Sequence, residues 1–207
     1  LTLVVVNNSG QTSAKIKLDN QLTIETLKAA KYHFTLGIVD AASPSLELPQ
    51  KHAGVGLARK IGLDLALPHI KKSRCLLFST DADSLLDKNY LKTTQNYFNE
   101  KNIQAAVTGF KHQPNSNPEL TQAINSYELF LKSTAQQLES AGSPYCYVAM
   151  GSTIVCTANS YAAVAGMPRK KATEDFYFLQ KLSKFCGVYS IPEILVYPSS
   201  RPVNRVY

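Results

Sequence analysis

Short apolar runs alternate with helical patterns along the first 140 residues. The apolar runs, each bounded by polar or turn residues, predict buried strands at residues 3–6, 34–39, 75–78 and 103–110. Patterns with helical spacing lie between and after them, at residues 22–31 (capped near Asn20), 56–67, 87–98 and 119–140. This alternation predicts an α/β fold with a mostly parallel central sheet flanked by helices.

The pattern changes after about residue 141. Residues 145–156 are strand-like, residues 160–164 and 173–185 are helical, and residues 188–191 and 194–197 predict two closing strands. No internal repeat or low-complexity segment interrupts the chain. We therefore expect one domain over residues 1–207, with a smaller lobe at its C-terminal end.

Two carboxylates, Asp81 and Asp83, follow the strand predicted at residues 75–78. Ligands of open α/β sheets bind just beyond the carboxyl ends of the strands. Two acids at such a position need a positive partner, and Mg²⁺ or Mn²⁺ takes one or two carboxylates while a substrate diphosphate supplies further oxygens. The pattern indicates a nucleotide-diphosphate site, although a turn with a helix-capping Asp explains the same residues.

Glu174 and Asp175 form a second acidic pair, directly after Thr173. Thr173 is a good N-cap, so both acids fall in a first helical turn, where the helix dipole favours negative charge. The other interpretation is that one carboxylate acts as a general base in the ligand crevice. Glycine-containing loops at residues 151–153 and 166–168 favour that role, because glycine lets the backbone approach a ligand.

Gly54 and Gly56 open the helix predicted at residues 56–67. The third glycine of a dinucleotide fingerprint is missing, because Arg59 stands in its place. Backbone N–H groups at such a helix start suit a phosphate, with Arg59 or Lys60 as the counter-charge. Close packing of the helix is the alternative explanation for the two glycines.

The net charge of +7 suits a phosphorylated ligand or an anionic surface. Basic residues are scattered, with short runs such as Lys71-Lys72 and residues 169–171, so we expect no nucleic-acid partner. The four cysteines show no metal-binding spacing. Cys75, Cys146 and Cys156 lie in apolar or strand-like runs, which predicts reduced, packed thiols and a cytoplasmic location. No apolar run reaches the roughly 18 residues of a transmembrane segment, which leaves peripheral membrane association open.

The order of these motifs resembles that of the family 2 glycosyltransferases, which have the GT-A fold. The matching segments are a first strand ending in polar residues, a second ending in Asp40, and residues 54–62 (GVGLARKIG), 78–84 (FSTDADS), 151–167 (GSTIVCTANSYAAVAGM) and 173–182 (TEDFYFLQKL). The final residues, 198–206 (PSSRPVNRV), are similar to the tail of a bacterial branch linked to cell-envelope polysaccharide, in which further chain follows. We therefore expect a piece of a longer protein.

The resemblance implies a transferase that moves a sugar from a nucleotide-diphosphate sugar to a hydroxyl of a carbohydrate or lipid-linked acceptor. It assigns residues 1–115 to a nucleotide-binding half and residues 116–207 to an acceptor-binding and catalytic half. Within the first half, it places Asn7 and Asp40 against the nucleoside, and Gly56 and Arg59 beside the nucleotide.

The four acids receive distinct roles from the same resemblance. Asp81 lies near the ribose and the metal, and Asp83 binds the Mn²⁺ or Mg²⁺ ion. Asp175 is the base of an inverting reaction, and Glu174 orients its neighbour. The cation would absorb the charge that develops on the leaving diphosphate.

The chain departs from the family pattern in two respects. Many relatives place a late His or a further acid near the metal, whereas all four His precede Glu174 here, so the third ligand is not identified. The Gln-x-x-Arg-Trp motif of processive members is missing and the chain contains no Trp, which favours transfer of single sugars. Tyr145, Tyr147 and Tyr161 are candidates for sugar stacking or for ordinary packing.

Other classes of protein fit parts of the pattern. A phosphatase or phosphotransferase of the haloacid-dehalogenase type also has Asp-x-Asp after a strand, but normally after the first core strand. A nucleotidyltransferase would carry a glycine-rich basic loop after its first strand, which is missing here. A non-catalytic relative that binds a nucleotide sugar is a further alternative.

Overall fold

The computed structural model describes residues 1–71 and 74–201 of the 207-residue chain. Lys72, in one of the basic runs, and residues 202–206 of the tail motif lie outside the described residues. The chain forms two compact units, the first made of Leu1–Ile70 with Gly166–Glu174 and the second of Lys71–Ala165 with the chain from Asp175 onward. The predicted functional halves, 1–115 and 116–207, stay a prediction.

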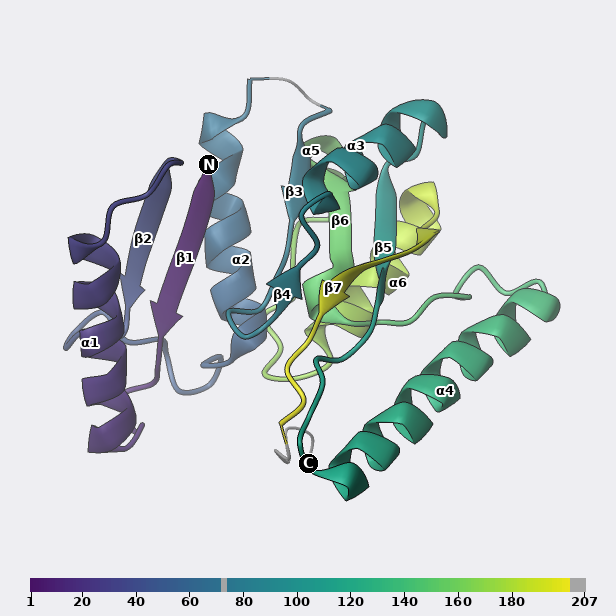
Figure 1. The fold of residues 1–207 in the computed structure, drawn as a ribbon. Coiled ribbons are helices and arrows are strands. Elements are labelled where there is room, and N and C mark those ends of the chain that lie inside the picture. The colour runs from purple at the N-terminus through teal and green to yellow at the C-terminus, as the bar shows by residue number, and fades with distance from the viewer. Residues whose placement is uncertain (72–73, 202–207) are drawn as a thin grey trace. The chain divides into compact units, whose positions relative to one another are not determined.

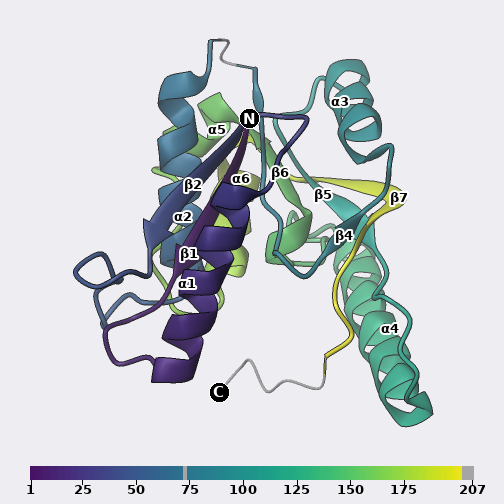
Figure 2. The ribbon, with the colours of Figure 1, turned by 60° about the vertical axis from the view of Figure 1, so that its left-hand side comes forward.

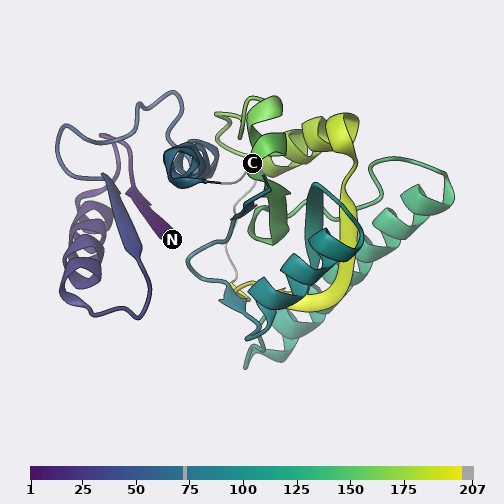
Figure 3. The same cartoon turned by 90° about the horizontal axis from the view of Figure 1, so that it is seen from above.

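The first unit is built on a pair of parallel strands. β1 (Thr2–Asn7) pairs with β2 (Leu36–Ala41), so that Val6 lies opposite Asp40 and Asn7 opposite Ala41. The helices α1 (Ala14–Ala29) and α2 (Val55–Ala66) lie on opposite sides of this pair, and a 3₁₀ turn, η1 (Leu67–His69), follows α2 (Figures 1 and 3). The parallel pairing brings the two predicted nucleoside contacts to the same end of the sheet.

The second unit is built on a five-stranded sheet with the order β3-β6-β5-β7-β4. The strands are β3 (Leu76–Phe78), β4 (Leu85–Leu86), β5 (Ala105–Phe110), β6 (Ile154–Thr157) and β7 (Tyr189–Tyr197). Figure 3 shows α3 (Tyr90–Glu100) on one side of this sheet, and α5 (Ala158–Ala163) and α6 (Glu174–Cys186) on the other. The turn η2 (Gly151–Thr153) precedes β6.

The long helix α4 (Pro118–Ser140) covers little of the sheet. Figure 2 shows it extending away from the strands, and Glu128 is its one buried residue. Asn117 caps its start, since the Asn117 side chain accepts hydrogen bonds from the backbone N–H groups of Glu119 and Leu120.

The prediction of an α/β fold is confirmed, but that of a mostly parallel sheet holds only in part. β1 and β2 are parallel, and so are β5 and β7. β6 runs antiparallel to both β3 and β5, and β4 runs antiparallel to β7. The antiparallel strands come from the region after residue 141, where the strand–helix alternation ends, and from the short β4, which the sequence pattern does not predict.

The first helix begins eight residues earlier than predicted. Asn20, the expected cap, lies inside α1, and its side-chain amide donates to the carbonyl of Asn7 (3.2 Å) and to Oδ1 of Asn8 (2.8 Å). Polar residues dominate the first two turns of α1, so the apolar spacing that marks a helix becomes clear only from Leu22 onward.

The strand predicted at residues 145–156 and the two predicted after residue 187 also differ from the structure. Only β6 forms a strand in the first segment, because the turn at Gly151–Thr153 interrupts it. The last two predicted strands are one strand, β7, with irregular pairing to β5 around Gly109. A Cβ on Gly109 would lie 2.5 Å from the carbonyl oxygen of Glu193, so glycine is needed where β7 bulges.

Two smaller expectations have mixed outcomes. None of the four cysteines forms a disulfide, as predicted, but Cys75 is exposed rather than packed. Within the part of the chain that the structure describes, no helix is both long enough and apolar enough to cross a membrane.

Candidate functional site

The Asp-x-Asp segment forms a turn directly after β3. The backbone N–H of Ser79 donates to Ile154 in β6 (3.1 Å), and that of Ser84 donates to the carbonyl of Asp81 (3.1 Å). The turn therefore begins at the carboxyl end of β3, as the sequence predicts, and both Asp81 and Asp83 are half-buried.

Arg201 pairs with Asp83, a contact that the sequence pattern did not predict. Nη2 of Arg201 donates to Oδ2 of Asp83. Gln113 supports this arrangement, because its side-chain amide donates both to the carbonyl of Asp83 and to that of Tyr197, each at 2.8 Å. The only sequence signal for Arg201 is its place in the tail motif at residues 198–206.

A divalent cation would find two carboxylates at this turn. No group of three or more His, Cys, Asp or Glu suited to a metal occurs among residues 1–71 and 74–201. Mg²⁺ and Mn²⁺ are commonly held by one or two carboxylates together with substrate phosphates. Asp81 and Asp83 fit that mode of binding, in which phosphate oxygens complete the shell, and do not fit a site built from protein ligands alone.

Glu174 and Asp175 have different surroundings. Glu174 is buried and its carboxylate pairs with Nη1 of Arg59, within the first unit. Asp175 is half-buried, belongs to the second unit, and its Oδ1 accepts a hydrogen bond from the N–H of Phe176 (2.8 Å). Thr173 is not the expected N-cap: its φ of +60° lies outside the extended region that a capping residue adopts, and its hydroxyl donates to the carbonyl of Ala172.

The start of α2 is closely packed against residues 168–174. A Cβ on Gly56 would lie 2.3 Å from the carbonyl oxygen of Lys170 and 2.9 Å from that of Pro168. The chain's own backbone therefore requires glycine at position 56, which agrees with the interpretation that close packing of the helix explains this glycine. The Arg59–Glu174 pair joins the same two segments, and the predicted nucleotide contacts of Gly56 and Arg59 stay predictions.

Asp40 is held by the loop that follows it. Its Oδ1 accepts from the N–H groups of Ala42 (3.0 Å) and Ser43 (2.9 Å), and its Oδ2 accepts from the Ser43 hydroxyl (2.6 Å). The hydroxyl bond is the main cause that lowers the pKa of Asp40 below its usual value, against the opposing effect of burial. The carboxylate is thus ionised and oriented beside the end of β1, where Asn7 lies.

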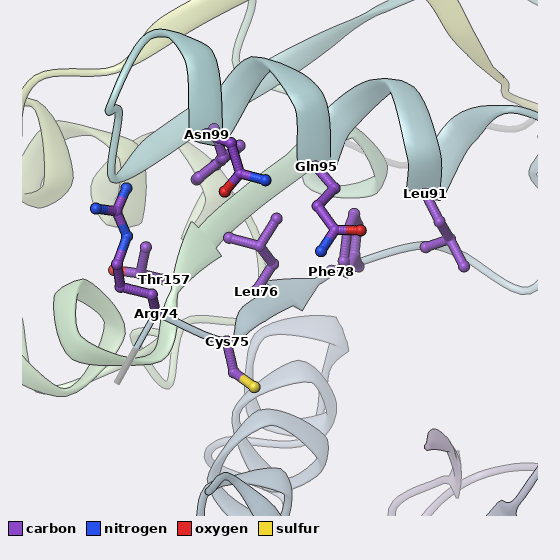
Figure 4. A pocket seen from close by; sticks show the side chains of 9 residues that line it. Arg74, Cys75, Leu76, Phe78, Leu91, Gln95, Asn99 and Thr157 are labelled. Atoms are coloured by element: carbon purple, nitrogen blue, oxygen red, sulfur yellow. The ribbon is translucent and has the colours of Figure 1, made fainter. Parts of the chain in front are cut away.

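The second unit also contains a cavity beside α3. It measures about 380 Å³ and lies between β3 and α3, where Leu91, Gln95 and Asn99 descend toward Leu76 (Figure 4). Its nine lining residues include none of the predicted site residues. Size alone therefore does not locate the predicted chemistry.

No protein-family model and no curated protein sequence matches the chain. Solved structures of TarS from S. aureus match its fold. TarS 1-349 gives a TM-score of 0.59 at 14% identity, covering 95% of this chain and 50% of that chain. The same protein in complex with UDP-GlcNAc gives 0.57 at 14% identity, covering 99% and 52%. The complex with UDP gives 0.52 at 12% identity, covering 95% and 50%.

This chain spans about half the length of those structures. At such low identity, the likeness shows the fold alone, and it confirms the predicted fold class.

Gly56→Ala tests whether packing fixes the start of α2. The new methyl group would meet the carbonyl oxygens of Pro168 and Lys170, and we expect a loss of about 1–3 kcal/mol in the free energy of unfolding from overpacking. Gly62→Ala in the same helix is the control, because its Cβ would meet only a Val5 methyl group, at 3.1 Å. Urea unfolding of the three proteins measures the effect, and equal stability of both variants would contradict the packing interpretation.

Proposed function

We propose that the chain is the donor-binding and catalytic part of a glycosyltransferase that uses a nucleotide-diphosphate sugar. The observation that carries this proposal is the pair of carboxylates at the end of β3, in a fold shared with a protein solved with UDP-GlcNAc and UDP. Neither the fold nor the pair of carboxylates would suffice alone, because one fold hosts many functions and Asp-x-Asp turns are common.

The reaction that we propose is displacement at the anomeric carbon of the donor sugar. Asp175 removes the proton of an acceptor hydroxyl, whose oxygen forms a bond to that carbon as the bond to the diphosphate oxygen breaks. The bonding electrons leave with the diphosphate, and attack from the opposite face inverts the configuration. A bound Mn²⁺ or Mg²⁺ supplies Lewis-acid stabilisation of the leaving diphosphate.

The surrounding residues have separate tasks in this proposal. Asp83, helped by Asp81, holds the cation, and Asn7 and Asp40 bind the nucleoside. When the donor binds, the guanidinium of Arg201 shifts from Asp83 toward the diphosphate and donates hydrogen bonds to it. Glu174 is not the base, because its carboxylate is engaged by Arg59. Transfer of single sugars, rather than chain synthesis, remains part of the proposal.

The first test of the proposal is a thermal-shift panel of UDP- and GDP-sugars, each with and without Mn²⁺. A ligand that binds only the native state raises the melting temperature by mass action. At a ligand concentration of 100 times the Kd, the gain in the free energy of unfolding is about 2.7 kcal/mol. We expect at least one nucleotide sugar to raise the melting temperature, and more so with Mn²⁺. No shift with any nucleotide or nucleotide sugar would contradict donor binding.

Asp83→Ala tests the cation site. We expect the Mn²⁺-dependent part of nucleotide-diphosphate affinity to fall by 10-fold or more, since the carboxylate is a proposed metal ligand; about 1.4 kcal/mol corresponds to each factor of ten. Asp87→Asn is the control, because Asp87 follows the same turn and Asn keeps the oxygen that accepts from the Asn89 N–H. Calorimetric titration with UDP measures both, and unchanged Mn²⁺-dependent affinity in Asp83→Ala would count against the assignment.

Asp175→Asn separates the base from the nucleotide contacts. Asn keeps an oxygen that accepts from the Phe176 N–H, so we expect the helix start to persist and nucleotide affinity to change by less than about 3-fold. Transfer and slow hydrolysis of the donor sugar should fall by about 10² or more, the usual scale for a missing general base. Parallel loss of binding and turnover would show that Asp175 is a nucleotide contact instead.

A further inference from the structure

A second cavity of the second unit, about 250 Å³ in volume, opens beyond the carboxyl end of β5. Three chain segments line it: residues 111–115 after β5, one face of α4, and Ser200 after β7. A cavity of this size suits one sugar ring.

A buried carboxylate at this cavity orients a histidine. Oε1 of Glu128 accepts hydrogen bonds from the backbone N–H of His112 (2.6 Å) and lies 2.9 Å from the ring atom Nδ1, while Oε2 accepts from Lys132 (3.1 Å). Burial alone would raise the pKa of Glu128, but these hydrogen bonds outweigh it and lower the pKa below its usual value. Glu128 is therefore an anion at neutral pH.

The position of the His112 ring follows from this contact. An ionised carboxylate next to Nδ1 selects the form of the ring that carries a proton on Nδ1. The rings of Phe110 and Tyr127 flank the imidazole, with centroids 5.9 and 6.4 Å away. Nε2 makes no hydrogen bond with the residues that the structure describes, and His112 lines the cavity. The chain thus holds an oriented imidazole at a polar cavity.

The remaining lining is rich in groups that both donate and accept hydrogen bonds. Asn115, Asn125 and Thr121 line the cavity together with Gln113 and Ser200. The side chain of Asn125, on α4, makes no hydrogen bond within the described part of the chain. Carboxamides and hydroxyls match the hydroxyl groups of a sugar, each of which donates one hydrogen bond and accepts others.

Hydrogen bonds connect this cavity to the Asp-x-Asp turn. Gln113, which lines the cavity, donates to the carbonyl of Asp83 (2.8 Å), and the Ser200 hydroxyl donates to the carbonyl of Gln113. Asn115 donates to the carbonyl of Ser200 (2.9 Å), next to Arg201. One set of hydrogen bonds therefore connects the cavity lining to the backbone of Asp83, whose carboxylate pairs with Arg201.

We propose that this cavity binds a neutral sugar ring of the acceptor, with His112 and Asn125 as specificity-determining residues. The role as acceptor subsite rests on the proposed glycosyltransferase function, whereas the binding of a sugar ring does not. His112 acts as a hydrogen-bond partner of a ring hydroxyl, and Glu128 is its positioning residue. The polar lining does not suit a lipid chain, and a charged occupant that pairs with Lys111, which also lines the cavity, is tested below with phosphate.

The proposal is tested by NMR on protein with ¹³C-labelled histidine, without donor or metal. The chain has four histidines, and His112→Asn identifies the His112 signal by its loss. The probes are methyl β-glucopyranoside and methyl β-galactopyranoside, with cyclohexanol as a ring of similar size that bears one hydroxyl, and inorganic phosphate. We expect at least one pyranoside to shift the His112 signal in a saturable manner, and cyclohexanol and phosphate to leave it unchanged.

Two variants of α4 localise the binding. Asn125→Ala should weaken pyranoside binding by about 5-fold, the scale of one lost hydrogen bond. Gln122→Ala changes an exposed carboxamide on the same helix that does not line the cavity, and should leave binding unchanged. No saturable shift up to about 100 mM pyranoside, an equal effect of both variants, or a response to phosphate alone would each overturn the proposal.

The outcome is independent of the donor-binding test. Donor binding in the thermal-shift panel without a pyranoside response at His112 would leave the glycosyltransferase proposal standing and reject this subsite. A pyranoside response without donor binding would support the sugar-binding cavity and reject its role as an acceptor subsite.

Discussion

The pairing of β5 between β6 and β7 is the constraint on which the second unit depends. Ala105, Ala106, Val107, Thr108 and Phe110 are all buried, so both faces of β5 are covered. Gly109 remains free of a side chain because the backbone of β7 bulges toward it. The end of β5 then determines where residues 111–115 lie, and these contact both the Asp-x-Asp turn and the smaller cavity.

Charged side chains near the proposed sites are compensated by partners, most of them distant in sequence. Glu174 pairs with Arg59, Asp83 with Arg201, and Glu128 with His112 and Lys132. A buried carboxylate without such a partner would be strongly unfavourable. The pairs therefore stabilise the fold. The Arg201–Asp83 pair also orients a proposed metal ligand, and the Glu128–His112 pair orients the proposed sugar-binding imidazole. Arg201 and a metal cation would compete for the carboxylate of Asp83, so binding of the cation would weaken the Arg201–Asp83 pair.

The Glu-Asp pair illustrates how one motif serves two purposes. Glu174 belongs to the first unit and is bound there by Arg59, whereas Asp175 begins the second unit's part of α6. Adjacent acids in a first helical turn have equal claims to a catalytic role on sequence alone. Their different burial and partners support Asp175 as the base and Glu174 as a structural residue that anchors the return of the chain to α2.

The sequence by itself determined the α/β class, most of the helices and the position of Asp81 and Asp83 at a strand end, because apolar periodicity and turn residues act locally. It did not determine strand direction after residue 141, the early start of α1, or the need for glycine at Gly56. Nor did it indicate Arg201 beside Asp83, or Glu128 beside His112. Those features depend on which distant segments meet: backbone approach decides where a Cβ fits, and burial decides which charges must be paired. Backbone approach and burial are both known only from the tertiary structure.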